Sequence, residues 1–75
     1  MPRTTLDLKG LACPLPVLRA NKALRALAAG DELEVLATDF AAPADFRSFC
    51  KTAGHELLTS VEHDGIFTFV LRKGG

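Results

Sequence analysis

Two prolines separated by a single residue, Pro14 and Pro16, constrain the fold of this chain more than any other feature. Proline has a fixed φ and no backbone N–H, so it fits the first turn of a helix but disrupts a helix interior or a central strand. It also favours an extended conformation for the residue before it, here Cys13. The pair therefore predicts a helix that begins at Pro14, with Cys13 at or just before its N-terminal cap.

The remaining segments are bounded by glycines and by one turn. Gly30 and Gly54 each follow a run of helix-forming residues and supply a stop for it. Asp64-Gly65 lies between two segments rich in β-branched and aromatic residues, which is a strong hairpin signal. The predicted elements are strands at residues 4–8, 32–38, 56–62 and 66–72 and helices at 14–29 and 43–53.

This β-α-β-α-β-β order predicts an α+β fold, a two-layer α/β sandwich in which two helices cover one face of a four-stranded mixed sheet. The pattern leaves the strand order open. The chain of 75 residues suffices for one small domain, residues 1–75. A domain of this size buries only about 60% of its unfolded surface, so chemistry is expected at the end of an element rather than in a deep cavity.

Composition limits the class of function. The hydrophobic content of 48% excludes intrinsic disorder, and the net charge of zero argues against direct nucleic-acid binding. No apolar run approaches the roughly 18 residues of a membrane span, and Met1-Pro2-Arg3 leads directly into a strand-like segment. Two cysteines do not make a disulfide framework. We therefore expect a cytoplasmic protein, without a membrane partner and monomeric.

The helical periodicity predicts which side chains face the sheet. On the second helix Cys50 falls on the apolar face, so it is most simply a core residue. Because Cys50 faces inward, we do not expect it to form a pair with Cys13. The predicted inward faces comprise Val17, Ala20, Leu24, Leu27 and Ala28 on the first helix and Phe46, Phe49, Cys50 and Ala53 on the second.

Cys13 is the candidate reactive residue. A charge at a helix N-terminus gains about 0.3–1 kcal/mol, and up to about 2 kcal/mol in good geometry. The position at the helix start, with Lys9 assisting, would therefore lower the pKa of the Cys13 thiol from about 8.5, so that the thiol is near half ionisation at neutral pH. Neither histidine is local, so acyl-transfer chemistry is not favoured. The alternative is that Cys13 is a small apolar residue packed at the helix start.

A basic stripe on the first helix faces away from its predicted buried side. It is either a solvated helix face or a docking surface, with leucines as anchors and basic groups steering a partner. The candidate partner-docking residues are Leu15, Leu18, Arg19, Lys22 and Arg25.

At this point the chain resembles the TusA/SirA-like sulfur-carrier family. The resemblance rests on residues 7–16, Asp-Leu-Lys-Gly-Leu-Ala-Cys-Pro-Leu-Pro, which carry Cys-Pro-X-Pro, and on the run Phe-Cys-Lys-Thr-Ala-Gly-His-Glu-Leu at 49–57. It covers nearly the whole chain in the right order. One departure is Phe40 with Pro43, where many relatives place proline directly after the aspartate; this reshapes the loop before the second helix and leaves the cysteine untouched.

The resemblance implies that Cys13 is the catalytic residue of a sulfurtransferase, supported by the motif residues Gly10, Pro14 and Pro16. It would accept a sulfane sulfur as a persulfide from a cysteine desulfurase or a rhodanese-like donor and pass it to an acceptor protein. Family outlets are tRNA thiolation, molybdenum-cofactor maturation and sulfur oxidation. No cofactor is implied. The alternatives are a non-catalytic regulatory or protein-binding module and a thiol redox sensor.

Two further features remain. His55 and His63 are separated by a strand and do not suggest a metal site; His55 is expected to bond a carbonyl at the helix end. The terminal Gly74-Gly75 resembles ubiquitin-like carriers that bear a thiocarboxylate, but the element order does not fit their β-grasp architecture. A frayed chain end is the preferred interpretation.

Overall fold

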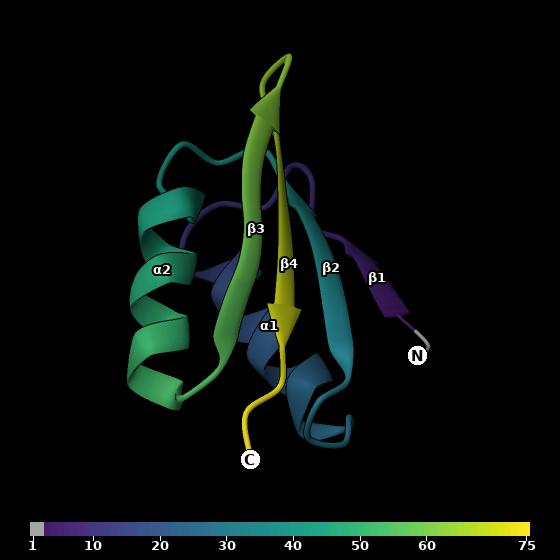
Figure 1. Ribbon diagram of the computed structural model, residues 1–75. Helices are drawn as coiled ribbons and strands as arrows, with labels where there is room; N and C mark the ends of the chain where they lie inside the picture. The colour runs from purple at the N-terminus through teal and green to yellow at the C-terminus, as the bar shows by residue number, and fades with distance from the viewer. Residues whose placement is uncertain (1–2) are drawn as a thin grey trace.

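The computed structural model describes residues 3–75, so the first two residues of the predicted domain, Met1 and Pro2, lie outside the described residues. The element order β-α-β-α-β-β and the α+β class are confirmed (Figure 1). No described helix is long and apolar enough to cross a membrane. The elements are β1 (Arg3–Asp7), α1 (Leu15–Arg25), β2 (Glu32–Ala37), α2 (Ala42–Ala53), β3 (Glu56–His63) and β4 (Ile66–Arg72).

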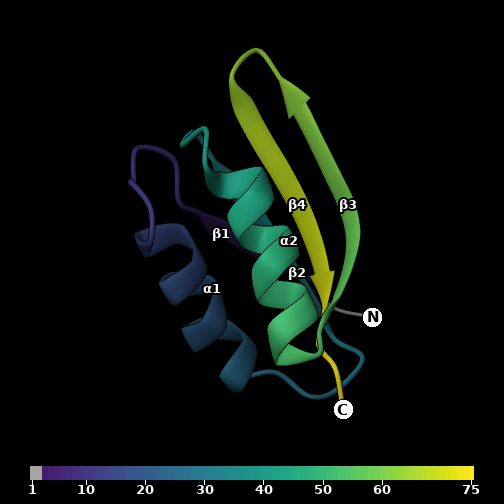
Figure 2. The same ribbon diagram turned by 90° about the vertical axis from the view of Figure 1, so that its left-hand side faces the viewer.

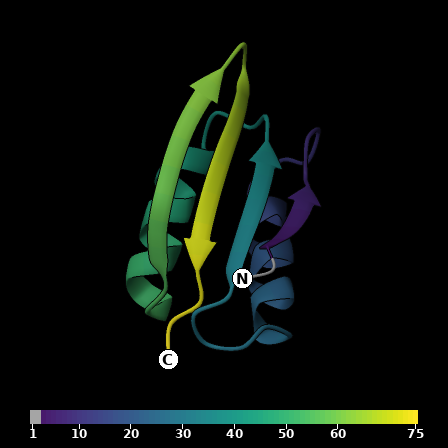
Figure 3. The same cartoon turned by 45° about the vertical axis from the view of Figure 1, so that its right-hand side comes forward.

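The four strands form one mixed sheet in the order β1-β2-β4-β3. β1 runs parallel to β2, whereas β4 runs antiparallel to both of its neighbours, β2 and β3. Both helices lie on the same face of this sheet, side by side (Figure 2). Seen from the other side, the sheet is in front and the helices are behind it (Figure 3). The last strand therefore inserts between β2 and β3, which is the order that the sequence pattern left open.

The core fills the space between the sheet and the two helices. β2 turns alternate side chains inward, since Leu33, Val35 and Ala37 are all fully buried. From the helix side, Phe46 stacks on Phe69 of β4 with ring centroids 4.6 Å apart. The buried cluster also contains Leu8, Ala20, Leu24, Ala42, Cys50 and Leu71.

The first helix ends at Arg25, earlier than the predicted Ala29. Its last turn tightens, because the Leu27 N–H donates to the Leu24 carbonyl instead of continuing the α-helical pattern. The Ala28 N–H then donates to the Asp31 carboxylate at 3.0 Å, which draws the chain into a turn. The prediction that Ala28 faces the core was therefore wrong. Ala53, at the last position of α2, is also exposed rather than buried.

The C-terminal segment is held by hydrogen bonds rather than frayed, which corrects the prediction. Lys73 exchanges backbone hydrogen bonds with Gly30 and Asp31, both 2.9 Å long. His55 bonds the Cys50 carbonyl at the end of α2 through its backbone N–H at 2.9 Å, as expected, and its Nδ1 also accepts the Gly74 N–H at 3.0 Å. A Cβ atom at Gly74 would overlap the Gly54 carbonyl oxygen. Glycine is therefore required here for close backbone approach.

Candidate functional site

The site lies at the end of the sheet formed by the carboxyl ends of β1 and β2. Because these strands are parallel neighbours, the loops that follow them meet at their carboxyl ends. The Gly10 N–H donates to the Thr38 hydroxyl at 2.9 Å, and the Cys13 N–H donates to Oδ2 of Asp39 at 2.8 Å. Gly10 has a φ of 84°, which a side chain would strain. The loop carrying Cys13 is thus fixed by the loop after β2.

Cys13 lies just before the cap of α1, close to the predicted position. Pro14 is the N-cap and the helix begins at Leu15, one residue later than the sequence predicts. Pro16 is buried in the first turn, where its missing N–H removes no helical bond. The Cys13 side chain is exposed. The prolines therefore present the thiol at the end of the helix rather than in the core.

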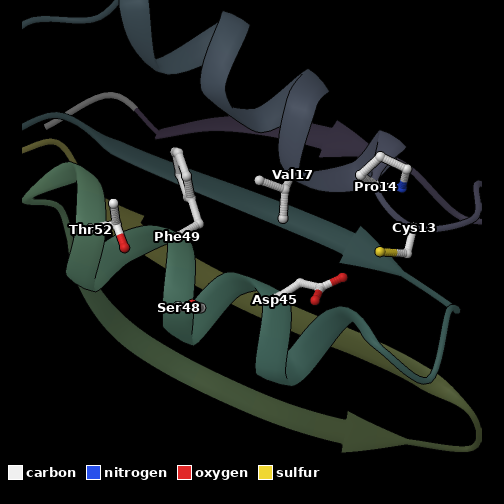
Figure 4. A pocket seen from close by; sticks show the side chains of 7 residues that line it. All are labelled: Cys13, Pro14, Val17, Asp45, Ser48, Phe49 and Thr52. Atoms are coloured by element: carbon white, nitrogen blue, oxygen red, sulfur yellow. The ribbon is translucent and has the colours of Figure 1, made fainter.

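A groove of about 370 Å³ runs between α1 and α2 and starts at this cysteine. The Cys13 sulfur points into the space between the two helices, on the side of Asp45 (Figure 4). Val17 of α1 and Phe49 of α2 give the groove its apolar part, while hydroxyl groups follow along α2. The lining residues are Cys13, Pro14, Val17, Asp45, Ser48, Phe49 and Thr52.

The electrostatic surroundings of Cys13 are acidic, which corrects the prediction of a readily ionised thiol. A hydrogen bond with Asp45 raises the pKa of the Cys13 thiol, helped by partial desolvation and by the negative charges of Asp45 and Asp39. These charges disfavour a thiolate beside them. Lys9, expected to assist ionisation, instead pairs with Asp7 at 3.8 Å. The two carboxylates therefore outweigh the stabilisation that the N-terminus of α1 gives to a thiolate.

This environment predicts a pH profile. Alkylation of Cys13 by iodoacetamide requires the thiolate, so its rate should rise with pH and reach half of its maximum at a higher pH than for N-acetylcysteinamide, whose thiol has no charged neighbour. The modified cysteine can be assigned by peptide mass spectrometry. A half-maximum below that of N-acetylcysteinamide would contradict the inhibitory role of the two carboxylates.

Asp39 and Asp45 are site residues that sequence reasoning missed. A signal for Asp45 exists, since an acidic residue in the first turn of a helix is stabilised by the helix dipole, but it gives no hint that Cys13 is nearby. The ligand atoms of Cys13, Asp39 and Asp45 lie within 4.8 Å of one another. Within residues 3–75 they are the side chains best placed to hold a cation, although one exposed thiol and two half-buried acids do not by themselves define a metal site.

The other titratable candidates lie elsewhere. Cys50 is buried, and burial raises its pKa to about 11. His63 is the exposed last residue of β3, beside Asp64 of the turn, whereas His55 directly precedes the first residue of that strand. Within residues 3–75 the side chains of His55, His63 and Cys50 do not form a cluster of ligand atoms. Cys13 is left as the accessible thiol.

The predicted docking residues all lie on α1, outside the groove. Leu15 is 40% exposed and Leu18 is 56% exposed. The basic side chains beyond them are also exposed: Arg19, Lys22 and Arg25. The helix thus carries an apolar area near Cys13 that continues into a basic one.

Fold and site together define a small α+β domain that presents one accessible cysteine beside the carboxyl ends of two parallel strands. The family model "Sulfurtransferase TusA" matches residues 4–73. The chain therefore belongs to the TusA sulfurtransferase family, and the role of a sulfur carrier follows from this membership.

Relatives and a solved structure agree with this assignment. A Neisseria meningitidis relative is 57% identical over 68 residues, which cover 91% of this chain and 92% of the relative. The sulfur carrier protein TusA of Allochromatium vinosum is 48% identical over 68 residues, which cover 91% of this chain and 90% of that protein. The crystal structure of a SirA-like protein from Desulfitobacterium hafniense superposes with a TM-score of 0.84 at 30% identity, covering 96% of this chain and 99% of that one.

Proposed function

We propose that this protein carries sulfane sulfur as a persulfide on Cys13, which it receives from a donor protein and passes to an acceptor protein. The observation that carries the proposal is the position of Cys13 as an exposed thiol at the open end of a groove. The donor would be a cysteine desulfurase or a rhodanese-like protein. The acceptor would serve tRNA thiolation, molybdenum-cofactor maturation or sulfur oxidation. A cytoplasmic location fits two free thiols.

Sulfur transfer of this kind is a displacement at sulfur. The Cys13 thiolate attacks the outer sulfur of a donor persulfide, and a new S–S bond forms on Sγ. The S–S bond of the donor breaks, and its electron pair leaves on the donor cysteine, which takes up a proton. In the second transfer, a nucleophilic sulfur of the acceptor attacks the outer sulfur of the Cys13 persulfide, and Cys13 leaves as a thiolate. No external oxidant or reductant is needed for either step.

The geometry of the site favours a carrier over the two alternatives. A redox-sensing cysteine depends on a low pKa, whereas the carboxylates raise the pKa of Cys13. A purely structural or binding module has no use for a thiol held at the surface by a hydrogen-bonded loop. A surface cysteine that reacts only in a docked complex suits protein-to-protein sulfur transfer.

Mass spectrometry tests the proposal directly. The protein is incubated with a cysteine desulfurase and cysteine, without a reducing agent, and should gain about 32 Da, the mass of one sulfur atom, on the peptide that contains Cys13. Absence of the adduct would favour the binding module. Sulfenylation or glutathionylation of Cys13 as the dominant product would favour the redox sensor.

The basic stripe of α1 is proposed to dock the partner. Arg19 and Lys22 lie beyond the exposed Leu15 and Leu18, so a partner that covers these leucines would meet both basic groups. Exposed charges at the rim of an interface mainly steer the encounter, and apolar anchors give binding energy. This surface therefore predicts association that weakens as salt concentration rises.

Reversing both charges, Arg19→Glu with Lys22→Glu, is expected to slow sulfur transfer from the desulfurase by about tenfold at low salt. The rate of Cys13 alkylation by iodoacetamide should remain close to that of the unmodified protein. A matched control is Arg47→Glu with Lys51→Glu, which reverses two exposed charges of α2 that do not line the groove. Equal transfer rates in the two double variants would leave the stripe as solvated surface only.

A further inference from the structure

The groove beside Cys13 is negatively charged. Among the side chains that line it, Asp45 is the only one that carries a charge. Within residues 3–75, neither Asp45 nor Asp39 takes part in an ion pair. The nearest basic residue of the same loop, Lys9, pairs with Asp7. The basic groups of α1 lie on its exposed side, outside the groove.

These carboxylates lie where a reacting partner must place its own sulfur. The carboxylate oxygens and the Cys13 sulfur are within 4.8 Å of one another, and the sulfur points towards the side of Asp45 (Figure 4). Displacement at sulfur brings the attacking, central and leaving sulfurs into one line, so the groups attached to the leaving sulfur enter this acidic region. At such distances an unpaired carboxylate attracts a cation and repels an anion.

We propose that Asp45 is a specificity-determining residue that selects sulfur partners carrying a positive charge beside their reacting sulfur. The inference rests on the proposed function, since it concerns the same reaction of Cys13. The partner is a cysteine-bearing protein segment with a lysine or arginine close to that cysteine. Its cation lies against Asp45, while its apolar part contacts Val17 and Phe49 in the groove. The same cation offsets the carboxylate charge, so the Cys13 thiol ionises when the partner docks.

Small disulfides of different charge test this selectivity without any donor enzyme. The Cys13 thiolate attacks one sulfur of the disulfide, a new S–S bond forms, and the other half leaves as a thiol. The probes are cystamine, which is cationic, 2-hydroxyethyl disulfide, which is neutral, and 3,3′-dithiodipropionate, which is anionic. Each rate is divided by the rate of the same probe with N-acetylcysteinamide, a thiol that carries no charged group beside its sulfur. Ratios between probes then report charge selectivity, because the thiolate fraction of Cys13 is common to all three.

Cystamine is expected to react about three- to tenfold faster than dithiodipropionate after this correction. High salt, about 1 M, should remove most of the preference. In Asp45→Asn the preference should largely disappear, although both absolute rates increase because the thiol ionises more easily. Asp45→Glu keeps the charge and should retain the preference, as should Ser48→Ala, which alters the same groove without a change of charge.

Equal corrected rates for the three probes in the unmodified protein would overturn the proposal. So would an Asp45→Asn variant that keeps the full preference for cystamine. The result is independent of sulfur loading: selectivity with no persulfide adduct would reject the carrier function alone, whereas loading without selectivity would reject only the role of Asp45.

Discussion

Replacing Cys13 with serine is expected to abolish sulfur loading, so that no adduct of about 32 Da forms after incubation with a cysteine desulfurase and cysteine. A serine hydroxyl is of nearly the same size but does not ionise at neutral pH and forms no persulfide. The side chain is exposed, and the bond from residue 13 to Asp39 is made by the backbone N–H, which serine retains. The fold should therefore be unaffected. The unfolding midpoint should match that of the unmodified protein.

The second cysteine provides the matched control. Cys50→Ala leaves Cys13 as the single thiol and should still gain one sulfur, although it removes a buried side chain. The intact mass of each variant and the mapped peptides distinguish the two sites. An adduct that persists in Cys13→Ser and vanishes in Cys50→Ala would reject Cys13 as the carrier residue. Such a result would also require α2 to open, since Cys50 is only 3% exposed.

The order and type of the elements could be predicted because their signals are local. Pro14 and Pro16 mark one helix start, and Asp64-Gly65 marks the hairpin. Both features depend on φ values that these residues themselves adopt, so they can be predicted from a few adjacent positions. The strand order was not predictable in this way. Insertion of β4 between β2 and β3 depends on contacts between segments distant in sequence, such as the pairing of Val35 with Phe69.

The reactive cysteine was predictable, whereas its electrostatic environment was not. A proline after Cys13 places the residue at a helix start, and this information is contained in adjacent residues. Asp39 and Asp45 reach the same point only after β1 pairs with β2 and α2 packs beside α1. The helix dipole, a local effect, therefore predicted the wrong direction for the pKa. Two carboxylates from another part of the chain determine its sign.

The end of the first helix is a similar case. Residues 26–29 have high helix propensity, but propensity is a weak preference that a few tertiary bonds override. Asp31 accepts the Ala28 N–H, and the amino group of Lys73 bonds the Leu27 carbonyl from the far end of the chain. The same contacts hold Lys73 against the turn, so the chain end and the helix end are determined together.

Phe46→Ala is expected to lower the free energy of unfolding by about 3–5 kcal/mol, a large part of the total for a domain of this length. The side chain is fully buried and stacks on Phe69 at a centroid distance of 4.6 Å, so its removal leaves a cavity between α2 and the sheet. Urea denaturation followed by circular dichroism measures the loss as a lower midpoint with a similar slope.

Phe40→Ala is the matched control, since it deletes the same atoms from a ring that is 88% exposed. We expect a change within about 0.5 kcal/mol there. Equal stability of the two variants would mean that the Phe46–Phe69 contact does not organise the core. Phe46 also adjoins Asp45 on α2, so where Phe46→Ala still folds, the cystamine preference of Cys13 should decrease as the helix loosens. Core packing on the sheet side would then be what holds the acidic side of the groove in place.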